Sequence, residues 1–217
     1  MTWHAVLFDL DGTLADTVPL ILASARHAMA EIRGEAELGE AWREHIGRPL
    51  SDTIRDFARD EEEGERLRAS YSAFQSEAHD RMVRPFPGAL EVVEELDRRG
   101  IPLGIVTSKG RAMTVRTLAV CGLANAFRVV VTADEVQRGK PDPEPVHRAL
   151  AALGMPAAEE IAFVGDSPHD IEAGRGAGIF TVGVTWGAFP RDRVVAARPD
   201  RMIETMGELL ELGPGGR

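Results

Sequence analysis

Two aspartates stand two residues apart at the end of an apolar run near the start of the chain. The run at residues 6–8 is followed by Asp9, one leucine, Asp11 and then Gly12. Carboxylates repel one another, so an apolar strand gains no stability from two of them at its end. The spacing suits a nucleophile with an acid/base partner, because Asp9 could attack phosphorus while Asp11 protonates the leaving oxygen. Gly12 would let the backbone turn tightly enough for both carboxylates to face one point.

Other polar residues that could serve the same reaction also follow apolar runs. They are Thr107 and Ser108 after residues 103–106, Asp166 after residues 161–164 with Asp170 one helical turn later, and Lys140 before a helical pattern. The carboxyl ends of strands in a parallel sheet meet at one edge, and ligands bind there. We therefore expect these side chains to converge on one crevice if the apolar runs are strands.

The converging side chains would form a cradle for a metal-bound phosphoryl group. Asp9, Asp11 and Asp166 offer hard oxygen ligands, and Mg²⁺ accepts a few carboxylates together with phosphate oxygens. Lys140 and the Thr107 hydroxyl would then stabilise the oxygens of the transferred group. The reaction predicted from these residues is phosphoryl transfer to Asp9, giving an aspartyl-phosphate that water hydrolyses.

An alternation of strand and helix patterns supports the common edge. The expected strands are 5–8, 103–106, 129–131, 161–164 and 180–184, and the expected helices are 89–99, 111–120, 143–153 and 168–174. Strands that alternate with helices over short connections indicate an α/β fold with a parallel sheet covered on both faces. The predicted fold class is therefore a Rossmann-like, doubly wound parallel sheet.

Residues 17–81 interrupt this alternation. The stretch is highly charged, has helical patterns and contains no strand pattern, and we expect helices at 17–33, 42–46, 51–59 and 65–80 with a solvated turn at 61–65. The predicted domains are an α/β catalytic core of residues 1–16 and 82–217 and a small all-helical cap of residues 17–81, inserted after the first strand. The connections at 13–16 and 82–86 would act as hinges.

Composition excludes several other classes of protein. The net charge of −10 disfavours nucleic-acid binding, which needs basic surfaces, and no apolar stretch is long enough to span a membrane. The single cysteine, Cys121, excludes an internal disulfide and a thiolate zinc cluster. These features predict a cytoplasmic protein that binds neither a nucleic acid nor a membrane. We expect a monomer or homodimer whose partner is a small phosphorylated molecule.

Four motifs in order resemble those of the haloacid dehalogenase superfamily, in its phosphatase branch. They are DLDGT at 9–13, VTSK at 106–109, GKPDP at 139–143 and VGDSPHD at 164–170. The resemblance implies that Mg²⁺ is held by the Asp9 side chain, the Asp11 main-chain carbonyl and Asp166. It implies that Asp170 orients a metal-bound water or Lys140. It also selects Lys140 over Lys109 as the catalytic lysine, which leaves Lys109 with a structural role.

Differences between this sequence and the motifs of other members of the superfamily exclude several of the superfamily's reactions. Dehalogenases and phosphonate-cleaving relatives lack the second acid of the first motif, so Asp11 argues against both chemistries. Sugar phosphomutase relatives have a cap histidine just after the Asp-Thr pair, whereas the first histidine after Asp16-Thr17 is His27. The prediction is a Mg²⁺-dependent phosphatase of this superfamily.

The cap segment at 45–57 resembles those of small-acid phosphatases, such as phosphoglycolate phosphatase, and of related pyrophosphatases. Arg48 in this segment could pair with a substrate carboxylate or second phosphate, for which its planar guanidinium is suited. A phosphoglycolate-like phosphomonoester is therefore the expected substrate. The alternatives are inorganic pyrophosphate, a sugar phosphate, transfer to another alcohol, or a non-catalytic protein that binds phosphate for regulation.

Overall fold

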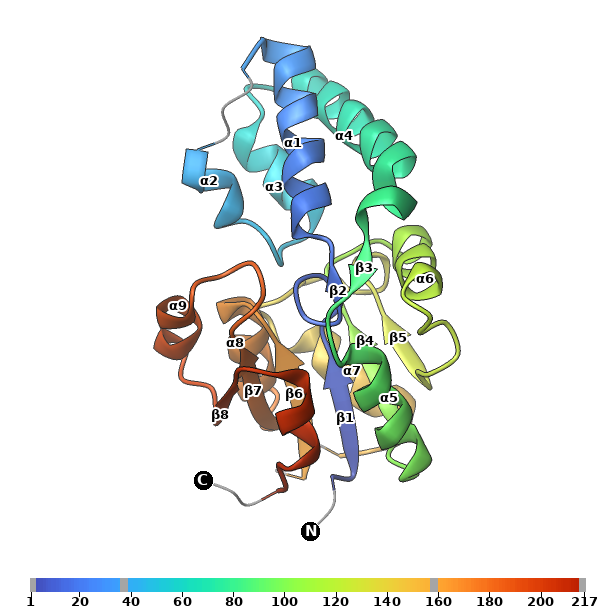
Figure 1. The fold of residues 1–217 in the computed structure, drawn as a ribbon. Helices are drawn as coiled ribbons and strands as arrows, with labels where there is room; N and C mark the ends of the chain where they lie inside the picture. The colour runs from blue at the N-terminus through green and yellow to red at the C-terminus, as the bar shows by residue number, and fades with distance from the viewer. Residues whose placement is uncertain (1–2, 36–38, 157–159, 215–217) are drawn as a thin grey trace.

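A six-stranded parallel sheet forms the centre of the computed structural model, which describes residues 3–35, 39–156 and 160–214 (Figure 1). The strand order is β5-β4-β1-β6-β7-β8. The strands are β1 (Ala5–Phe8), β4 (Leu103–Val106), β5 (Val129–Val131), β6 (Ile161–Gly165), β7 (Phe180–Val184) and β8 (Arg201–Ile203). The predicted α/β fold with a doubly wound parallel sheet is thus confirmed, with β8 as an additional edge strand.

Helices pack on both faces of this sheet, as the alternation of patterns predicts. They are α5 (Ala89–Arg98), α6 (Arg111–Val120), α7 (Glu144–Leu153), α8 (Pro168–Gly176) and α9 (Arg191–Ala196). Successive residues of β1 point to opposite faces: Val6 and Phe8 join the core under α5 and α6, whereas Ala5 and Leu7 join the core under α7 and α8. Because β1 is apolar on both faces, the first polar residue after it, Asp9, marks where the strand leaves the core.

The residues between β2 (Ala15–Asp16) and β3 (Arg84–Pro85) form a layer of helices above the carboxyl edge of the sheet (Figure 1). These helices are α1 (Val18–Arg33), α2 (Gly39–Arg43), α3 (Leu50–Phe57) and α4 (Glu61–Met82). The short strands β2 and β3 pair antiparallel, so both connections leave the core side by side. We call residues 17–81 the helical insertion; its division from the rest as a separate domain stays a prediction.

The first turn of α4 corrects one expectation, because residues 61–65 are helical and not a solvated turn. The carboxylate of Asp60 caps the helix by accepting a hydrogen bond from the Glu63 backbone amide at 2.8 Å. Glutamates at 61–63 lie near the positive end of the helix dipole. Glu63 also accepts two hydrogen bonds from the Arg33 guanidinium, at 2.9 and 2.6 Å, so part of this acidic run is fixed by packing.

The C-terminal half of α4 is bonded to α6 of the core. His79 is fully buried, and its Nε2 lies 2.8 Å from the Thr117 hydroxyl. Arg116 of α6 donates to the Asp80 carboxylate and to the Ser76 carbonyl, both at 2.8 Å. These three hydrogen bonds therefore attach this end of the insertion to the helix that follows β4. Within the described part of the chain, no helix is long and apolar enough to cross a membrane.

We expect Thr117→Val to lower the free energy of unfolding by about 1–3 kcal/mol, because it leaves a buried imidazole nitrogen without a partner. Thr114→Val is the matched control: Thr114 is also buried in α6, but its hydroxyl donates only to the Gly110 carbonyl of its own helix. Urea unfolding of both variants measures the difference. Equal losses would contradict a specific role for the bond to His79.

Candidate active site

The acidic residues of the first and fourth motifs meet where β1 and β6 end. The backbone amide of Asp9 donates to the Val164 carbonyl at 2.9 Å, which continues the pairing of the two strands by one residue. Asp166 directly follows β6, and Asp170 lies in the first turn of α8. Carboxylate oxygens of Asp9, Asp166 and Asp170 all lie within 4.8 Å of one another, and all three residues are buried.

Lys140 joins these carboxylates from a third segment. Its Nζ donates to Asp9 Oδ1 at 2.6 Å, to Asp170 Oδ1 at 2.5 Å and to the Val106 carbonyl at 3.2 Å. Burial lowers the pKa of Lys140, but the charges of Asp170 and Asp9 outweigh it and hold this pKa above its ordinary value. The ammonium group is therefore charged, and its three bonds fix it between the nucleophile candidate and α8.

The buried cluster carries more negative than positive charge. Three carboxylates face one ammonium group, which leaves two negative charges in excess when all are ionised. Burial raises the pKa of Asp9 well above its usual range, against the attraction of Lys140, and the charges of Asp170 and Asp166 raise it further. Burial and the charge of Asp170 raise the pKa of Asp166 to about 7.

Backbone and small residues hold the Asp166 carboxylate from two loops. Its Oδ2 accepts from the Ala188 amide at 2.6 Å, and its Oδ1 accepts from the Thr13 hydroxyl at 3.3 Å. Gly12 has a φ of +87°, and a Cβ there would lie 2.4 Å from Asp166 Oδ2. A Cβ at Gly187 would lie 2.2 Å from Asp166 Cβ. Gly12 therefore serves both the turn between the aspartates and the close approach of the third acid.

Asp170 is held by the start of its own helix. Its Oδ2 accepts from the Ser167 amide at 3.0 Å and from the Ser167 hydroxyl at 2.6 Å, while its Oδ1 accepts from Lys140. The Ser167 hydroxyl in turn accepts from the Asp170 amide, so the two residues cap α8 reciprocally. Both oxygens of Asp170 thus have partners, which is the arrangement expected of a residue that orients Lys140.

The donor set fits a divalent cation. Asp9 and Asp166 present carboxylates whose protonated forms are favoured by burial, and two excess negative charges are what one divalent ion neutralises. Carboxylate oxygens are ligands that Mg²⁺ prefers. The residues that could hold the ion by side chain are Asp9 and Asp166, since Asp170 is already bonded to Lys140 and Ser167.

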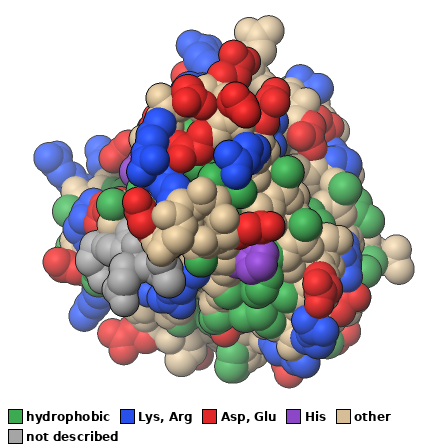
Figure 2. All heavy atoms as spheres, turned by 90° about the horizontal axis from the view of Figure 1, so that it is seen from above, with side chains coloured by type: hydrophobic (Ala, Val, Ile, Leu, Met, Phe, Trp, Pro, Cys, Tyr) green, Lys and Arg blue, Asp and Glu red, His purple; other side chains and the backbone are tan. Residues whose placement is uncertain are grey.

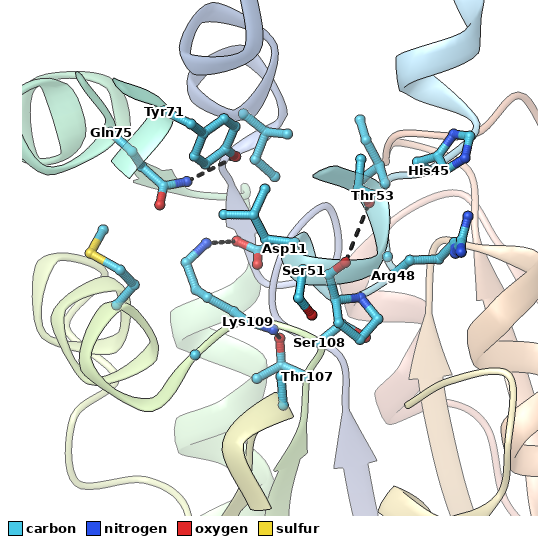
Figure 3. Close-up of a pocket in the computed structure, with 18 of the residues that line it drawn as sticks. Asp11, His45, Arg48, Ser51, Thr53, Tyr71, Gln75, Thr107, Ser108 and Lys109 are labelled. Atoms are coloured by element: carbon cyan, nitrogen blue, oxygen red, sulfur yellow. Dashed lines mark hydrogen bonds and ion pairs between the residues drawn. The ribbon is translucent and has the colours of Figure 1, made fainter. Parts of the chain in front are cut away.

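Asp11 lies apart from the cluster and has a different partner. Lys109 Nζ donates to Asp11 Oδ1 at 2.6 Å, and both side chains are largely buried (Figure 3). The sequence analysis gave Lys109 a structural role, but the structure places its ammonium group against the acid/base candidate. Its rarity could have indicated this, because Lys109 and Lys140 are the only lysines among 25 basic residues.

Two hydroxyl groups from the end of β4 face the same space. The Thr107 amide donates to the Val131 carbonyl at 3.0 Å, and the Thr107 hydroxyl accepts from the Lys109 amide at 3.2 Å. The Ser108 hydroxyl is buried and has no hydrogen-bond partner in the described chain. A buried hydroxyl without a partner costs free energy, so a bound anion at this place would satisfy it.

A cavity of about 320 Å³ lies between this edge of the sheet and the helical insertion. From the core it is lined by Asp9, Asp11, Thr107, Ser108 and Lys109; from the insertion its polar lining is His45, Arg48, Ser51, Thr53, Arg68, Tyr71, Ser72 and Gln75. The structure therefore brings Asp9, Asp11, Thr107 and Ser108 to one side of this cavity, whereas Lys140, Asp166 and Asp170 are buried and are not among its lining residues. The lining residues of α4 were not predicted, because charged and polar residues on a helix carry no pattern that distinguishes a cavity from solvent.

Arg48 lines this cavity, but its guanidinium is turned toward the insertion. Its Nη1 donates to Asp56 Oδ2 at 2.8 Å, and the same oxygen lies 3.4 Å from His45 Nε2. In Figure 3 the Arg48 side chain extends away from Asp11 and Lys109, toward His45. The described arrangement does not bring the Arg48 guanidinium together with the core residues.

The family follows from this geometry and from comparison with known proteins. A family model described as haloacid dehalogenase-like hydrolase matches residues 6–184, which include all four motifs. The chain belongs to this family. The predicted resemblance is confirmed, and the chain is a hydrolase of the haloacid dehalogenase-like fold.

Similar proteins match nearly the whole chain. A pyrophosphatase PpaX of Bacillus velezensis is 40% identical over 208 residues, covering 96% of this chain and 95% of the relative. A pyrophosphatase PpaX of Anoxybacillus flavithermus is 38% identical, covering 98% and 97%. A crystal structure described as a predicted phosphoglycolate phosphatase from Haemophilus somnus has a TM-score of 0.88 at 25% identity, covering 97% and 98%.

The raised pKa of Asp166 predicts how metal-free protein responds to pH. The folded chain keeps a proton on Asp166 up to about pH 7, whereas the unfolded chain releases it near pH 4. The stability from this group is therefore fully present below pH 4 and is lost as the pH rises to 7. We expect this rise in pH to lower the free energy of unfolding of the metal-free protein by a few kcal/mol.

Urea unfolding at pH 5 and pH 8, with chelator and with Mg²⁺, measures this effect. Mg²⁺ should stabilise the protein more at pH 8, and Asp166→Asn should reduce the pH dependence by the part that Asp166 contributes and remove most of the Mg²⁺ effect. Asp134→Asn is the control, because Asp134 lines the cavity outside the buried cluster. An unchanged Mg²⁺ effect in Asp166→Asn would show that the ion binds elsewhere.

Proposed function

We propose that this hydrolase is a Mg²⁺-dependent phosphatase that forms an aspartyl-phosphate on Asp9. The observation that carries the proposal is the position of Asp9. This buried residue lines a cavity, its carboxylate is held by a charged lysine at 2.6 Å, and two further buried acids lie beside it. A structural ion pair would not need this excess of buried charge, whereas a nucleophile that shares a metal ion does.

In the first step an Asp9 carboxylate oxygen attacks phosphorus, and the bond from phosphorus to the leaving oxygen breaks. Lys140 fixes the other oxygen of Asp9 and neutralises charge beside it. The Thr107 and Ser108 hydroxyls donate to oxygens of the transferred group. Asp11, in protonated form, gives its proton to the leaving oxygen.

In the second step water attacks phosphorus and the bond to the Asp9 oxygen breaks. Asp11 takes a proton from this water, and inorganic phosphate leaves with the water's oxygen. Lys109, which bonds Asp11 at 2.6 Å, positions this carboxylate in both steps. When bound between Asp9 and Asp166, Mg²⁺ supplies positive charge to the phosphate oxygens and lets Asp9 stay ionised.

The helical insertion would act as a cap over this site. Its residues line one side of the cavity, and its two connections are the paired strands β2 and β3. Closure of such a layer excludes water and selects the leaving group. We propose residues 17–81 as this cap and residues 1–16 and 82–217 as the catalytic core.

Two substrates are supported. The sequence alone favours a phosphoglycolate-like phosphomonoester, and the similar structure from Haemophilus somnus is described as a predicted phosphoglycolate phosphatase. The relatives at 38–40% identity carry the name pyrophosphatase, and Lys109 places positive charge beside Asp11, where the leaving group departs. We therefore place inorganic pyrophosphate first and phosphoglycolate second.

Phosphate release with and without Mg²⁺ tests the proposal on pyrophosphate, phosphoglycolate, sugar phosphates, nucleoside monophosphates and an aryl phosphate. We expect Mg²⁺-dependent release, fastest from pyrophosphate. Preference for a sugar phosphate would overturn the substrate assignment and keep the phosphatase. No release from any of them by a folded, Mg²⁺-binding chain would favour a regulatory phosphate-binding protein.

Asp9→Asn should lower kcat on the order of 10⁴-fold or more, because an amide cannot act as the nucleophile. Asp134→Asn, in the same cavity, should keep its activity. Acid-quenched protein analysed by mass spectrometry should carry one phosphoryl group on the peptide with Asp9, and Asp9→Asn should carry none. Substantial turnover by a folded Asp9→Asn variant would falsify the nucleophile assignment.

A further inference from the structure

Three long cationic side chains line the cavity, and they differ in what they bind. Lys109 is paired with Asp11 at 2.6 Å, and Arg48 is paired with Asp56 at 2.8 Å. Arg68 of α4 has no hydrogen bond or ion pair to any residue in 3–35, 39–156 or 160–214. Of the three lysine and arginine side chains that line the cavity, Arg68 is therefore the one with no carboxylate partner among the described residues.

Arg68 belongs to a polar stripe on one face of α4. Arg68, Ser72 and Gln75 follow one another at intervals of four and three residues, so they lie along the same side of the helix. All three line the cavity. Gln75 Nε2 donates to the hydroxyl of Tyr71 (Figure 3), and no residue that the structure describes donates to the amide oxygen of Gln75. The stripe therefore presents one cation and two neutral polar groups to the cavity.

The stripe has a defined position relative to the core. Ser76 and Asp80, near the C-terminal end of α4, are bonded to Arg116 of α6. The helix α6 begins directly after the loop that carries Thr107, Ser108 and Lys109. Arg68 precedes Ser76 by eight residues, which is about 12 Å along the helix axis. The attachment to α6 thus holds the stripe at a set distance from the hydroxyls that face the phosphate.

The face of the helical insertion seen in Figure 2 has no broad basic patch among its described residues. Figure 2 looks down on the helical insertion, and acidic and basic side chains are mixed over this face. In a chain with a net charge of −10, a substrate with several negative charges is repelled by the protein as a whole. A doubly anionic substrate therefore depends on individual cations inside the cavity.

We propose that Arg68 binds the second anionic group of the substrate while the first phosphate lies at Asp9. This inference rests on the proposed function and names its substrate class: small molecules with a phosphate and a second anion, which is a phosphate in pyrophosphate and a carboxylate in phosphoglycolate. The guanidinium group suits either anion because it donates two parallel hydrogen bonds. The inference differs from the expectation that Arg48 performs this task, because Arg48 is bonded to Asp56 and is turned away from Asp11.

The test compares Arg68→Gln with Arg66→Gln. Both arginines are exposed on α4 and each substitution removes one positive charge, but only Arg68 is among the residues that line the cavity. Steady-state kinetics at fixed free Mg²⁺ would use pyrophosphate, phosphoglycolate and p-nitrophenyl phosphate, which has no second anion. In Arg68→Gln we expect the ratio of kcat/KM for pyrophosphate to that for the aryl phosphate to fall about tenfold, through a rise in KM.

The substrate whose kcat/KM falls more in Arg68→Gln shows which second anion, phosphate or carboxylate, Arg68 binds. A larger loss on pyrophosphate assigns the second phosphate to Arg68, and a larger loss on phosphoglycolate assigns the carboxylate. Arg66→Gln should leave every ratio unchanged, and Arg68→Lys should recover part of the loss. An unchanged ratio in Arg68→Gln, or the same change in Arg66→Gln, would overturn the inference. A lowered ratio in Arg48→Gln alone would return the role to Arg48.

Calorimetry of pyrophosphate binding in the presence of Mg²⁺, with every variant made in the Asp9→Asn protein so that the ligand is not hydrolysed, separates this inference from the proposed function. We expect the dissociation constant to rise about tenfold in Arg68→Gln and to stay unchanged in Arg66→Gln. Binding that depends on Arg68, without hydrolysis by the protein that retains Asp9, would refute the phosphatase and keep the anion site. Hydrolysis with unaltered binding in Arg68→Gln would keep the phosphatase and refute the anion site.

Discussion

The excess of buried negative charge around Asp9 is the constraint on which the rest of the structure depends. Three carboxylates within 4.8 Å of one another would not stay together in a protein interior unless something opposed their repulsion. Lys140 opposes part of it through bonds to two of them. Burial, together with the repulsion that remains, raises the pKa values of Asp9 and Asp166. A cation, either a metal ion or a charged side chain of the cavity, would therefore stabilise the site by neutralising its excess negative charge.

The fold supplies what this arrangement requires. A parallel sheet brings the ends of β1, β4 and β6 to one edge, so residues far apart in sequence meet without long flexible loops. Strand pairing continues through the Asp9 amide, which fixes the backbone of the nucleophile candidate. Glycines at 12 and 187 let two loops close on Asp166 from either side. The Trp186 indole adds a donor to the Thr13 carbonyl at 3.1 Å and ties one of these loops to the other.

The core was predictable from the sequence because its pattern has two independent parts. Apolar runs of four or five residues identify the buried strands, and the polar residue that ends each run identifies the edge where ligands bind. The partners of these residues were less predictable. The contact between Lys109 and Asp11 spans 98 positions, and the amide that holds Asp166 belongs to Ala188, an apolar residue. In the helical insertion, the acidic first turn of α4 resembled a solvated turn because its cap and its bond to Arg33 are tertiary features.

The charged groups on the two sides of the cavity differ in whether they have partners. This difference would explain why the core residues determine the reaction and the residues of the insertion select the substrate. On the core side almost every charged group has a partner within 3 Å, so these positions are fixed and serve any phosphate. On the insertion side Arg48 is satisfied by Asp56, whereas Arg68 is not satisfied by any described residue. A cation without a carboxylate partner can bind an anionic ligand without first breaking an ion pair within the protein. Specificity would then depend on a single unpaired side chain, and the attachment of α4 to α6 sets how far from the reacting phosphate that side chain acts.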